Sequence, residues 1–366
     1  MSLENLVEME SFWKNKKVLL TGHNGFKGCW LLIWLINLGA EVWGISLPAN
    51  QTTILFNDVQ KEIKNSYSNI ELDINDEDKL NYFVKKIQPD IVIHLAAQAL
   101  VIRSYKEPLL TWKTNVIGSL NLLESLKNIN KKCSIVIVTT DKVYKNKDWD
   151  YGYRENDELG GSDPYSASKS ALEILVNSWI KSYCGIQNHQ INNLYISTAR
   201  SGNVIGGGDW ADNRIVPDLI KSIVLKNDLV IRNPNSTRPW QHVLDPLYGY
   251  LSLAKINYIN EKTNGQSYNF GPLLESNKSV SQLVESLYLK WGLKSSLTKI
   301  DNEFYESKLL NLNIDKAYKE LSWQPRWNYE ETIDKTINWY KKHANGNNSL
   351  NLCLGDIKNY SQRVNI

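Results

Sequence analysis

The first half of the chain alternates short apolar runs with stretches of helical periodicity. Continuous apolar or β-branched runs cover residues 17–21, 41–47, 90–95 and 134–139. Such runs are typical of parallel strands that are buried on both faces. The segments 29–38 and 108–128 carry the patterns of helices. This alternation predicts an α/β fold with a doubly wound, Rossmann-type parallel sheet.

Composition and charge narrow the class of protein. Of 366 residues, 42% are hydrophobic, and 42 basic residues nearly balance 39 acidic ones. This balance gives no reason to expect binding to nucleic acid or to a membrane surface. The longest apolar run, 30–36, is too short to span a bilayer, and residues 1–10 do not resemble a secretory signal. Four scattered cysteines suggest neither a disulfide framework nor a metal site, so we expect a soluble, cytoplasmic protein.

A glycine-rich turn follows the first predicted strand. Gly22, Gly25 and Gly28 stand between that strand and a helix. Glycine lets a backbone approach a pyrophosphate closely, and the free N–H groups of the helix start face its charge. The spacing G-x-x-G-x-x-G departs from the usual G-x-G-x-x-G, and the alternative is an ordinary βα loop. Its position in a βαβ unit favours dinucleotide binding.

The end of the second predicted strand bears on the choice of dinucleotide. An acidic residue that would bind a ribose hydroxyl is missing there, and Ser46 is the polar residue present. No Arg or Lys stands there to bind a 2′-phosphate. We therefore predict NAD rather than NADP. Lys27, inside the glycine-rich turn, is either a phosphate contact or a solvated surface lysine.

A Tyr-x-x-x-Lys pair lies on a predicted helix. Asp163 and Pro164 form a typical N-cap and first helical residue, so Tyr165 and Lys169 lie one turn apart on the same face. An ammonium close to a phenol favours the phenolate, which can accept a proton near neutral pH. The alternative is a chance pair on a helix. Downstream of a nucleotide-type turn, we favour catalysis.

A second polar group follows the predicted strand 134–139. Thr140, Asp141 and Lys142 stand at the carboxyl end of that strand, where open α/β sheets bind ligands. An acid and an amine at this place can supply acid–base chemistry. The alternative is a polar loop with a solvated ion pair.

After about residue 200 the chain changes to shorter elements separated by loops rich in Gly, Asn and Pro. We predict an NAD-binding Rossmann domain over residues 1–199. Residues 200–366 would form a mainly substrate-binding domain, with some segments returning to the first domain.

Five strings carry a resemblance to a known family. They are T-G-H-N-G-F-K-G at 21–28, T-D-K-V-Y at 140–144, D-P-Y-S-A-S-K at 163–169, R-S-G-N-V-I-G-G-G-D-W at 200–210 and R-P-W-Q-H-V at 238–243. The chain resembles extended short-chain dehydrogenase/reductases that act on nucleotide sugars, and among them the CDP-glucose 4,6-dehydratases. The resemblance runs from about residue 12 to about residue 340.

The resemblance implies a lyase reaction on CDP-glucose. NAD⁺ oxidises C4 of the glucose, water leaves across C5 and C6, and the hydride returns to C6. The product is a 4-keto-6-deoxy sugar, a precursor of deoxysugars such as those of lipopolysaccharide O-antigens. By resemblance Tyr165 is the base at the C4 hydroxyl, tuned by Lys169, and Thr140 hydrogen-bonds near the C4 oxygen. Asp141 is the acid on the leaving hydroxyl, and Lys142 stands where related dehydratases carry a Glu that removes the C5 proton.

The resemblance also implies binding residues. Cofactor contacts would come from the glycine-rich turn, two loops and one helix: Gly22, Asn24, Gly25, Phe26, Lys27, Gly28, Asp73, Ile74, Leu95, Ala96, Ala97 and Asn115, together with Tyr165 and Lys169. The substrate diphosphate would be held by Asn203, Arg238 and Asn269, with Arg214 as a further candidate. An Arg suits phosphate through its planar fork of donors.

Three alternatives stay open at this point. One is a 4-epimerase of the same fold, against which Asp141 and Lys142 argue. Another is a dehydratase for a different nucleotide sugar, and a third is an NAD-binding regulator without catalysis. The family pairs the helices from Pro108 and Pro164 across a two-fold axis, so the resemblance implies a homodimer or a dimer of dimers.

Overall fold

The computed structural model describes residues 9, 11–184, 193–295, 297–299 and 309–363. Its centre is a seven-stranded sheet in the order β11-β6-β5-β4-β1-β2-β3, and every neighbouring pair is parallel. The strands are β1 (Lys17–Thr21), β2 (Glu41–Ser46), β3 (Tyr67–Glu71), β4 (Ile91–His94), β5 (Cys133–Val138), β6 (Leu194–Ser201) and β11 (Ser267–Phe270). The predicted doubly wound fold is therefore confirmed.

Alternate residues of the strands feed two different cores. Val18 and Leu20 of β1 pack on one face, and Leu19 packs on the other. All three side chains are fully buried. Apolar runs without polar alternation therefore correctly predicted a sheet that is covered on both faces.

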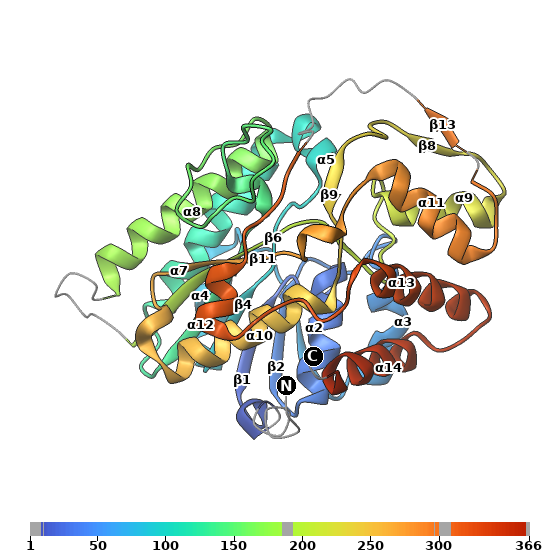
Figure 1. Ribbon diagram of the computed structural model, residues 1–366. Helices are drawn as coiled ribbons and strands as arrows, with labels where there is room; N and C mark the ends of the chain where they lie inside the picture. Colours follow the sequence, from blue (N-terminus) through green and yellow to red (C-terminus); the bar gives the residue numbers. More distant parts are fainter. Residues whose placement is uncertain (1–8, 10, 185–192, 296, 300–308, 364–366) are drawn as a thin grey trace.

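Helices cover both faces of this sheet (Figure 1). One face carries α4 (Glu77–Ile87), α7 (Ser119–Leu126) and α8 (Pro164–Tyr183). The other carries α2 (Phe26–Asn37) and α10 (Leu244–Ile259), with α14 (Ser349–Gln362) and α3 (Ile54–Ile63) beside α2. Two shorter helices, α5 (Val101–Lys106) and α6 (Pro108–Trp112), pack against α8.

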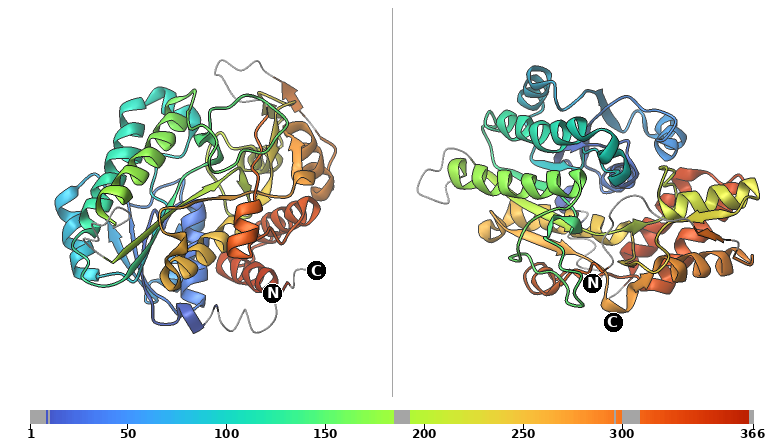
Figure 2. Two further views of the ribbon diagram at one scale, coloured as in Figure 1. Left: turned by 60° about the vertical axis from the view of Figure 1, so that its left-hand side comes forward. Right: turned by 90° about the horizontal axis from the view of Figure 1, so that it is seen from above.

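A smaller lobe stands beside the carboxyl ends of the strands. In Figure 2, seen from above, the green helix α8 and the orange and red helices of this lobe lie on opposite sides. Its helices are α9 (Ile215–Leu225), α11 (Val280–Trp291) and α13 (Tyr329–Ala344), and α12 (Asp315–Leu321) packs on β11. Its short strands are β7 (Val204–Ile205), β8 (Leu229–Ile231), β9 (Thr237–Pro239), β10 (Gln241–His242), β12 (Asn277–Ser279) and β13 (Leu297–Lys299).

The chain beyond residue 200 also contributes a strand and a helix to the sheet domain. Strand β11 pairs with β6, and α10 packs against β5. The division of the chain near residue 200 stays a prediction.

The helix expected over 108–128 is interrupted. Between α6 and α7 the turns widen into a π-helical segment, Lys113–Gly118. Within it, the Asn115 side chain binds the backbone of Gln98 on the loop after β4. Such wide turns are frequent at functional sites. Within the described residues, no helix has both the length and the apolar character that a membrane crossing requires.

Candidate active site

A cavity of about 600 Å³ opens between the sheet and the smaller lobe. Its floor is formed by the residues that follow β1, β4 and β5, at the carboxyl edge of the sheet. Its roof comes from the loops and short strands beyond residue 200. This is where doubly wound sheets bind their ligands.

The glycine-rich turn forms one end of the cavity. Gly22 has a φ of +74°, and a Cβ there would lie 2.7 Å from the backbone nitrogen of Ala96. A Cβ on Gly28 would overlap the Gly22 carbonyl oxygen. Helix α2 starts directly after Gly25, and in the described part of the chain no side chain caps that start. The turn thus offers a close backbone approach and exposed helix amides, which fit a dinucleotide pyrophosphate.

The lining continues past the end of β2. Ser46 and Leu47 both line the cavity, and Asn24 donates to the Leu47 carbonyl at 2.7 Å. The register pairs Ser46 with Glu71, so Asp73 follows at the end of the adjacent strand and also lines the cavity. A carboxylate is therefore present at this end, in the loop after β3, the strand next to the one where the pattern places it.

Helix α8 carries the Tyr-x-x-x-Lys pair into the cavity. The expected N-cap is confirmed, because Asp163 accepts from the Ser166 amide and forms a capping box, with Pro164 in the first turn. Tyr165 and Lys169 are both buried and both line the cavity. The Lys169 ammonium donates to the Val138 carbonyl at the end of β5, at 3.1 Å.

Burial dominates the protonation of this pair. It raises the pKa of Tyr165 to about 12, against the hydrogen bond from Thr140 and the charge of Arg214. Burial lowers the pKa of Lys169 to about 8. That Lys169 favours the phenolate stays a prediction. The Lys169 ammonium faces a backbone carbonyl, and the desolvation of Tyr165 is the larger effect.

Thr140, Asp141 and Lys142 form a tight turn directly after β5. Asp141 is fully buried, and its Oδ1 accepts from the Thr140 hydroxyl at 3.0 Å and lies 3.5 Å from the Lys142 amine. Its Oδ2 is buried without a hydrogen-bond partner in the described part of the chain. An orphaned carboxylate oxygen in a cavity is a ready partner for a ligand hydroxyl.

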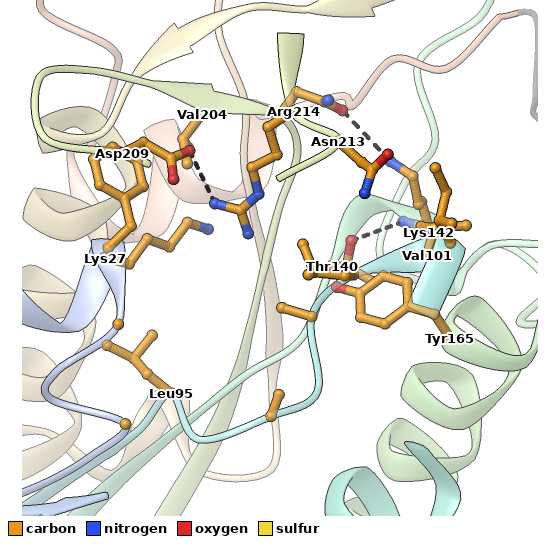
Figure 3. Close-up of a pocket in the computed structure, with 18 of the residues that line it drawn as sticks. Lys27, Leu95, Val101, Thr140, Lys142, Tyr165, Val204, Asp209, Asn213 and Arg214 are labelled. Carbon is orange, nitrogen blue, oxygen red and sulfur yellow. Dashed lines mark hydrogen bonds and ion pairs between the residues drawn. The ribbon is translucent and has the colours of Figure 1, made fainter. Parts of the chain in front are cut away.

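The smaller lobe adds cationic and amide groups (Figure 3). Arg214, Arg238 and Asn203 all line the cavity. Arg214 forms an ion pair of 3.0 Å with Asp209, and the Asn203 oxygen accepts from the Lys142 amine at 3.4 Å. Arg214 lies across the same space from Thr140 and Tyr165 in Figure 3.

The structure brings most of the candidate residues together. Those that line the cavity are Gly22, Asn24, Gly25, Phe26, Lys27, Gly28, Asp73, Ile74, Leu95, Ala96, Ala97, Thr140, Asp141, Lys142, Tyr165, Lys169, Asn203, Arg214 and Arg238. Their individual roles stay predictions.

Two candidates lie outside the lining, and for these the expected ligand contact is corrected. Asn269 is buried behind it, where its side chain binds the Tyr144 hydroxyl and the carbonyls of Tyr153 and Asn313. Asn115 is also fully buried, and its amide holds the backbone of Gln98 and the hydroxyl of Ser168. Both amides have their hydrogen bonds filled by the protein, so they shape the walls from behind.

Sequence reasoning missed a buried ion pair beneath the site. Arg200 of β6 and Glu173 of α8 lie 2.8 Å apart, and the hydroxyls of Thr139 and Thr198 also bind that carboxylate. The network ties α8 to the ends of β5 and β6. Glu173 lies four residues after Lys169, on the same helix face, which was the available signal.

The Lys27 side chain is partly buried and lines the cavity. Its amine donates to the Ser201 hydroxyl at 2.8 Å and to the Tyr250 hydroxyl at 3.3 Å. The phosphate contact of Lys27 stays a prediction. Ser201 ends β6 and Tyr250 lies on α10, so these contacts join distant parts of the chain.

The fold and this cavity define a nucleotide-sugar-modifying enzyme of the Rossmann type. Residues 19–336 match the model of the GDP-mannose 4,6 dehydratase family, and the chain belongs to that family. It is 39% identical over 353 residues to the CDP-glucose 4,6-dehydratase of Salmonella typhimurium. The alignment covers 96% of this chain and 98% of that relative. The expected resemblance is thereby confirmed.

Solved structures share the fold. The UDP-glucose 4-epimerase of Thermotoga maritima, crystallised with UDP-glucose, has a TM-score of 0.77 and 22% identity, over 90% of this chain and 99% of the other. The dTDP-glucose 4,6-dehydratase of Bacillus anthracis, in complex with NAD, has a TM-score of 0.73 and 21% identity, over 92% and 99%. At this identity the likeness concerns the fold.

Proposed function

We propose that the protein is an NAD-dependent CDP-glucose 4,6-dehydratase, which forms CDP-4-keto-6-deoxyglucose and water. One observation carries the proposal: a single cavity joins Tyr165 and Lys169 to the acid Asp141 and to a glycine cradle. The first pair suits oxidation at a hydroxyl, and the acid suits loss of a second hydroxyl. The 39% identical relative with this name supports the same reaction.

Bound NAD supplies the hydride acceptor and donor, and the chain supplies its site. The amides at the start of α2 hold the pyrophosphate, with Gly22 and Gly28 allowing the approach. Ser46 and Asp73, which line the cavity, bind the adenosine end of the cofactor, and Lys169, which also lines it, binds the other ribose. Ser46 brings no cation for a 2′-phosphate, so NAD is preferred over NADP.

The acid–base residues have separate tasks. Tyr165 takes the proton of the C4 hydroxyl while Thr140 orients that oxygen. Asp141, which is fully buried, donates a proton to the departing C6 hydroxyl. Lys142 passes its proton to the neighbouring Asp141 carboxylate, 3.5 Å away, and its neutral amine then accepts the C5 proton. A C4 ketone acidifies the C5 proton, so oxidation precedes elimination.

Arg214 and Arg238 hold the diphosphate and Asn203 orients it. The preference for a cytidine nucleotide is the most specific part of the proposal, and a comparison of three nucleotide sugars tests it. Purified protein with NAD⁺ is given CDP-, UDP- and dTDP-glucose separately, and 4-keto sugar is read by its absorbance in alkali. CDP-glucose should be consumed fastest, with loss of one water by mass spectrometry. Exclusive turnover of another nucleotide sugar, or stoichiometric NADH with a C6 carboxylate, contradicts the proposal.

A homodimer is part of the proposal. Helix α6 and the following π turn expose Leu109 (86%), Trp112 (40%) and Ile117 (48%), and α8 exposes Ile174 (60%). Large apolar groups gathered on adjacent helices are typical of an interface. An isologous contact through α6 and α8 would cover them. Sedimentation should show a dimer or a larger assembly at micromolar concentration, and a monomer there contradicts this part.

The four cysteines are free and buried, which suits a reducing compartment such as the cytoplasm. We include that location in the proposal, together with a role in supplying deoxysugars for surface polysaccharide. Fractionation of cells that express the full chain tests the location.

A further inference from the structure

The backbone and the side chain of Lys27 serve different parts of the cavity. The residue stands in the first turn of α2, next to the glycine cradle. Its amine leaves that cradle and reaches Ser201 and Tyr250, whose hydroxyls lie 2.6 Å from each other. Figure 3 shows the amine directed toward the side of the cavity where Arg214 and Thr140 lie. The amine therefore belongs to the chamber of the acid–base residues.

The charges around this amine leave it without a close counterion. In the described part of the chain, no ion pair within 4 Å involves Lys27. Asp141 is the carboxylate that acts on it most strongly. The titratable and charged groups that face it from the packed elements are Asp141 and Lys142 after β5, Tyr165 and Lys169 on α8, Arg214 before α9, and Tyr250 on α10.

This setting makes the charge of the amine dependent on pH. Burial lowers the pKa of Lys27 to about 7, and the positive charge of Arg214 lowers it further while Asp141 opposes the change. Ammonium and amine are then both populated near neutral pH. A charge that changes in this range inside a reaction chamber affects any ligand that carries charge there.

We propose that Lys27 tunes the redox balance of the bound dinucleotide, its ammonium favouring NADH over NAD⁺. This inference rests on the proposed function, because it needs the dinucleotide. A hydride passes directly between sugar and nicotinamide, so the ring must share the chamber of Tyr165. The ring is positive in NAD⁺ and neutral in NADH, and a nearby ammonium repels only the former. The charge thus favours transfer of the hydride from C4 of the sugar to the nicotinamide ring.

The test compares NAD⁺ with NADH in the cofactor-free full-length protein. Dissociation constants of both are measured by titration calorimetry from pH 6 to pH 9, for the wild type, Lys27→Met and Lys27→Arg. Both dinucleotides carry the same pyrophosphate, so the ratio of their constants cancels any phosphate contact. Met keeps the length of the side chain, and Arg keeps the charge at every pH tested.

At pH 6, Lys27→Met should improve NAD⁺ binding relative to NADH by about tenfold, the order expected for removal of one like charge within a cavity. The difference should vanish by pH 9, where the wild-type amine is neutral. Lys27→Arg should keep the wild-type ratio of pH 6 across the range. Lys79→Met, an exposed lysine on α4, is the matched control and should change nothing.

The outcomes separate this inference from the proposed function. Equal weakening of both dinucleotides by Lys27→Met would mean a phosphate contact and would overturn the inference. An unchanged ratio at pH 6, in a Lys27→Met variant that unfolds at no lower temperature than the wild type, would overturn it as well. If the wild type binds neither dinucleotide, the proposed function itself fails, and the inference fails with it.

Discussion

The two walls of the cavity are built in different ways. The acid–base wall, formed by Thr140, Asp141, Lys142, Tyr165 and Lys169, stands on the end of β5 and the first turns of α8. The anion wall, formed by Asn203, Arg214 and Arg238, stands on loops and short strands beyond β6. In the second wall, side-chain contacts hold Arg214 and Asn203, whereas Arg238 lies on β9 and donates to a backbone carbonyl.

The difference shows in how each wall holds its key groups. Lys169 binds a main-chain carbonyl of β5, and the Ser170 hydroxyl binds the Val143 carbonyl, so α8 is fastened to the backbone of the reaction site. The Arg214 side chain is 35% exposed and held by Asp209 alone among the ion pairs described. Proton transfer needs fixed distances, whereas a flexible diphosphate tolerates adjustment. We therefore expect the fixed wall to carry the proton transfers and the adjustable wall to bind the diphosphate.

The largest effect should come from the fixed wall. Tyr165→Phe removes the proton acceptor and should lower kcat by a factor of about 10³, within the range for one acid–base group. The dissociation constant of CDP-glucose should stay within a factor of about two, because the anion wall is intact. Steady-state kinetics and titration calorimetry check the two values. A similar loss of binding would show that Tyr165 serves the substrate as a whole.

Asp141→Asn should have the next largest effect. It removes the acid for the departing hydroxyl while keeping the size of the side chain, and kcat should fall by about 10². The uncompensated Lys142 charge beside it adds to the loss. Product formation under saturating substrate is the measurement, with Asp148→Asn on a partly exposed loop as the matched control. Retained activity in Asp141→Asn would move the acid to another residue.

A substitution in the adjustable wall should mainly raise KM. Arg214→Met removes charge-assisted hydrogen bonds to the diphosphate, each worth about 1.5–3 kcal/mol, so KM should rise by about 10- to 100-fold. The value of kcat should change by less than about threefold, because that loss affects ground state and transition state alike. Initial rates over a range of CDP-glucose concentrations separate the two constants. A fall in kcat with an unchanged KM would place Arg214 on the acid–base side.

The smallest effect concerns the stability of the folded protein, which depends on the charge of Lys27. The pKa of Lys27 is lowered to about 7 in the folded protein, so the unfolded chain binds more protons between about pH 7 and the usual range of a lysine. The stability of the wild type should therefore rise with pH through that window. Lys27→Met lacks this dependence, so its lead of a few degrees in Tm should shrink from pH 7 to pH 9. A constant gap in thermal melts without cofactor would contradict the lowered pKa.

The same contrast explains what the sequence could predict. Strand β1 agrees with its expected bounds at both ends, and Asp163 caps α8 as expected, because strand burial and helix capping are local patterns. The glycine-rich turn and the Tyr-x-x-x-Lys pair are local too, and they converge once the strand order is known.

Residues beyond β6 were harder to place, because their positions depend on contacts across the chain. Asn269 lies on a strand that returns to the sheet, and its amide faces Tyr144 rather than the cavity. Lys27 sits in a recognisable turn, yet its amine is directed by Ser201 and Tyr250, which lie 174 and 223 residues further along. No local pattern carries that information.

The central claim is that one cavity oxidises C4 and eliminates water across C5 and C6 within a single cycle. The most direct measurement follows deuterium from CDP-[4-²H]glucose incubated with the purified protein and catalytic NAD⁺. The account predicts CDP-4-keto-6-deoxyglucose with the deuterium at C6 and no net reduction of the cofactor. Deuterium found again at C4 of an epimerised sugar, or left in accumulated reduced cofactor, would contradict it.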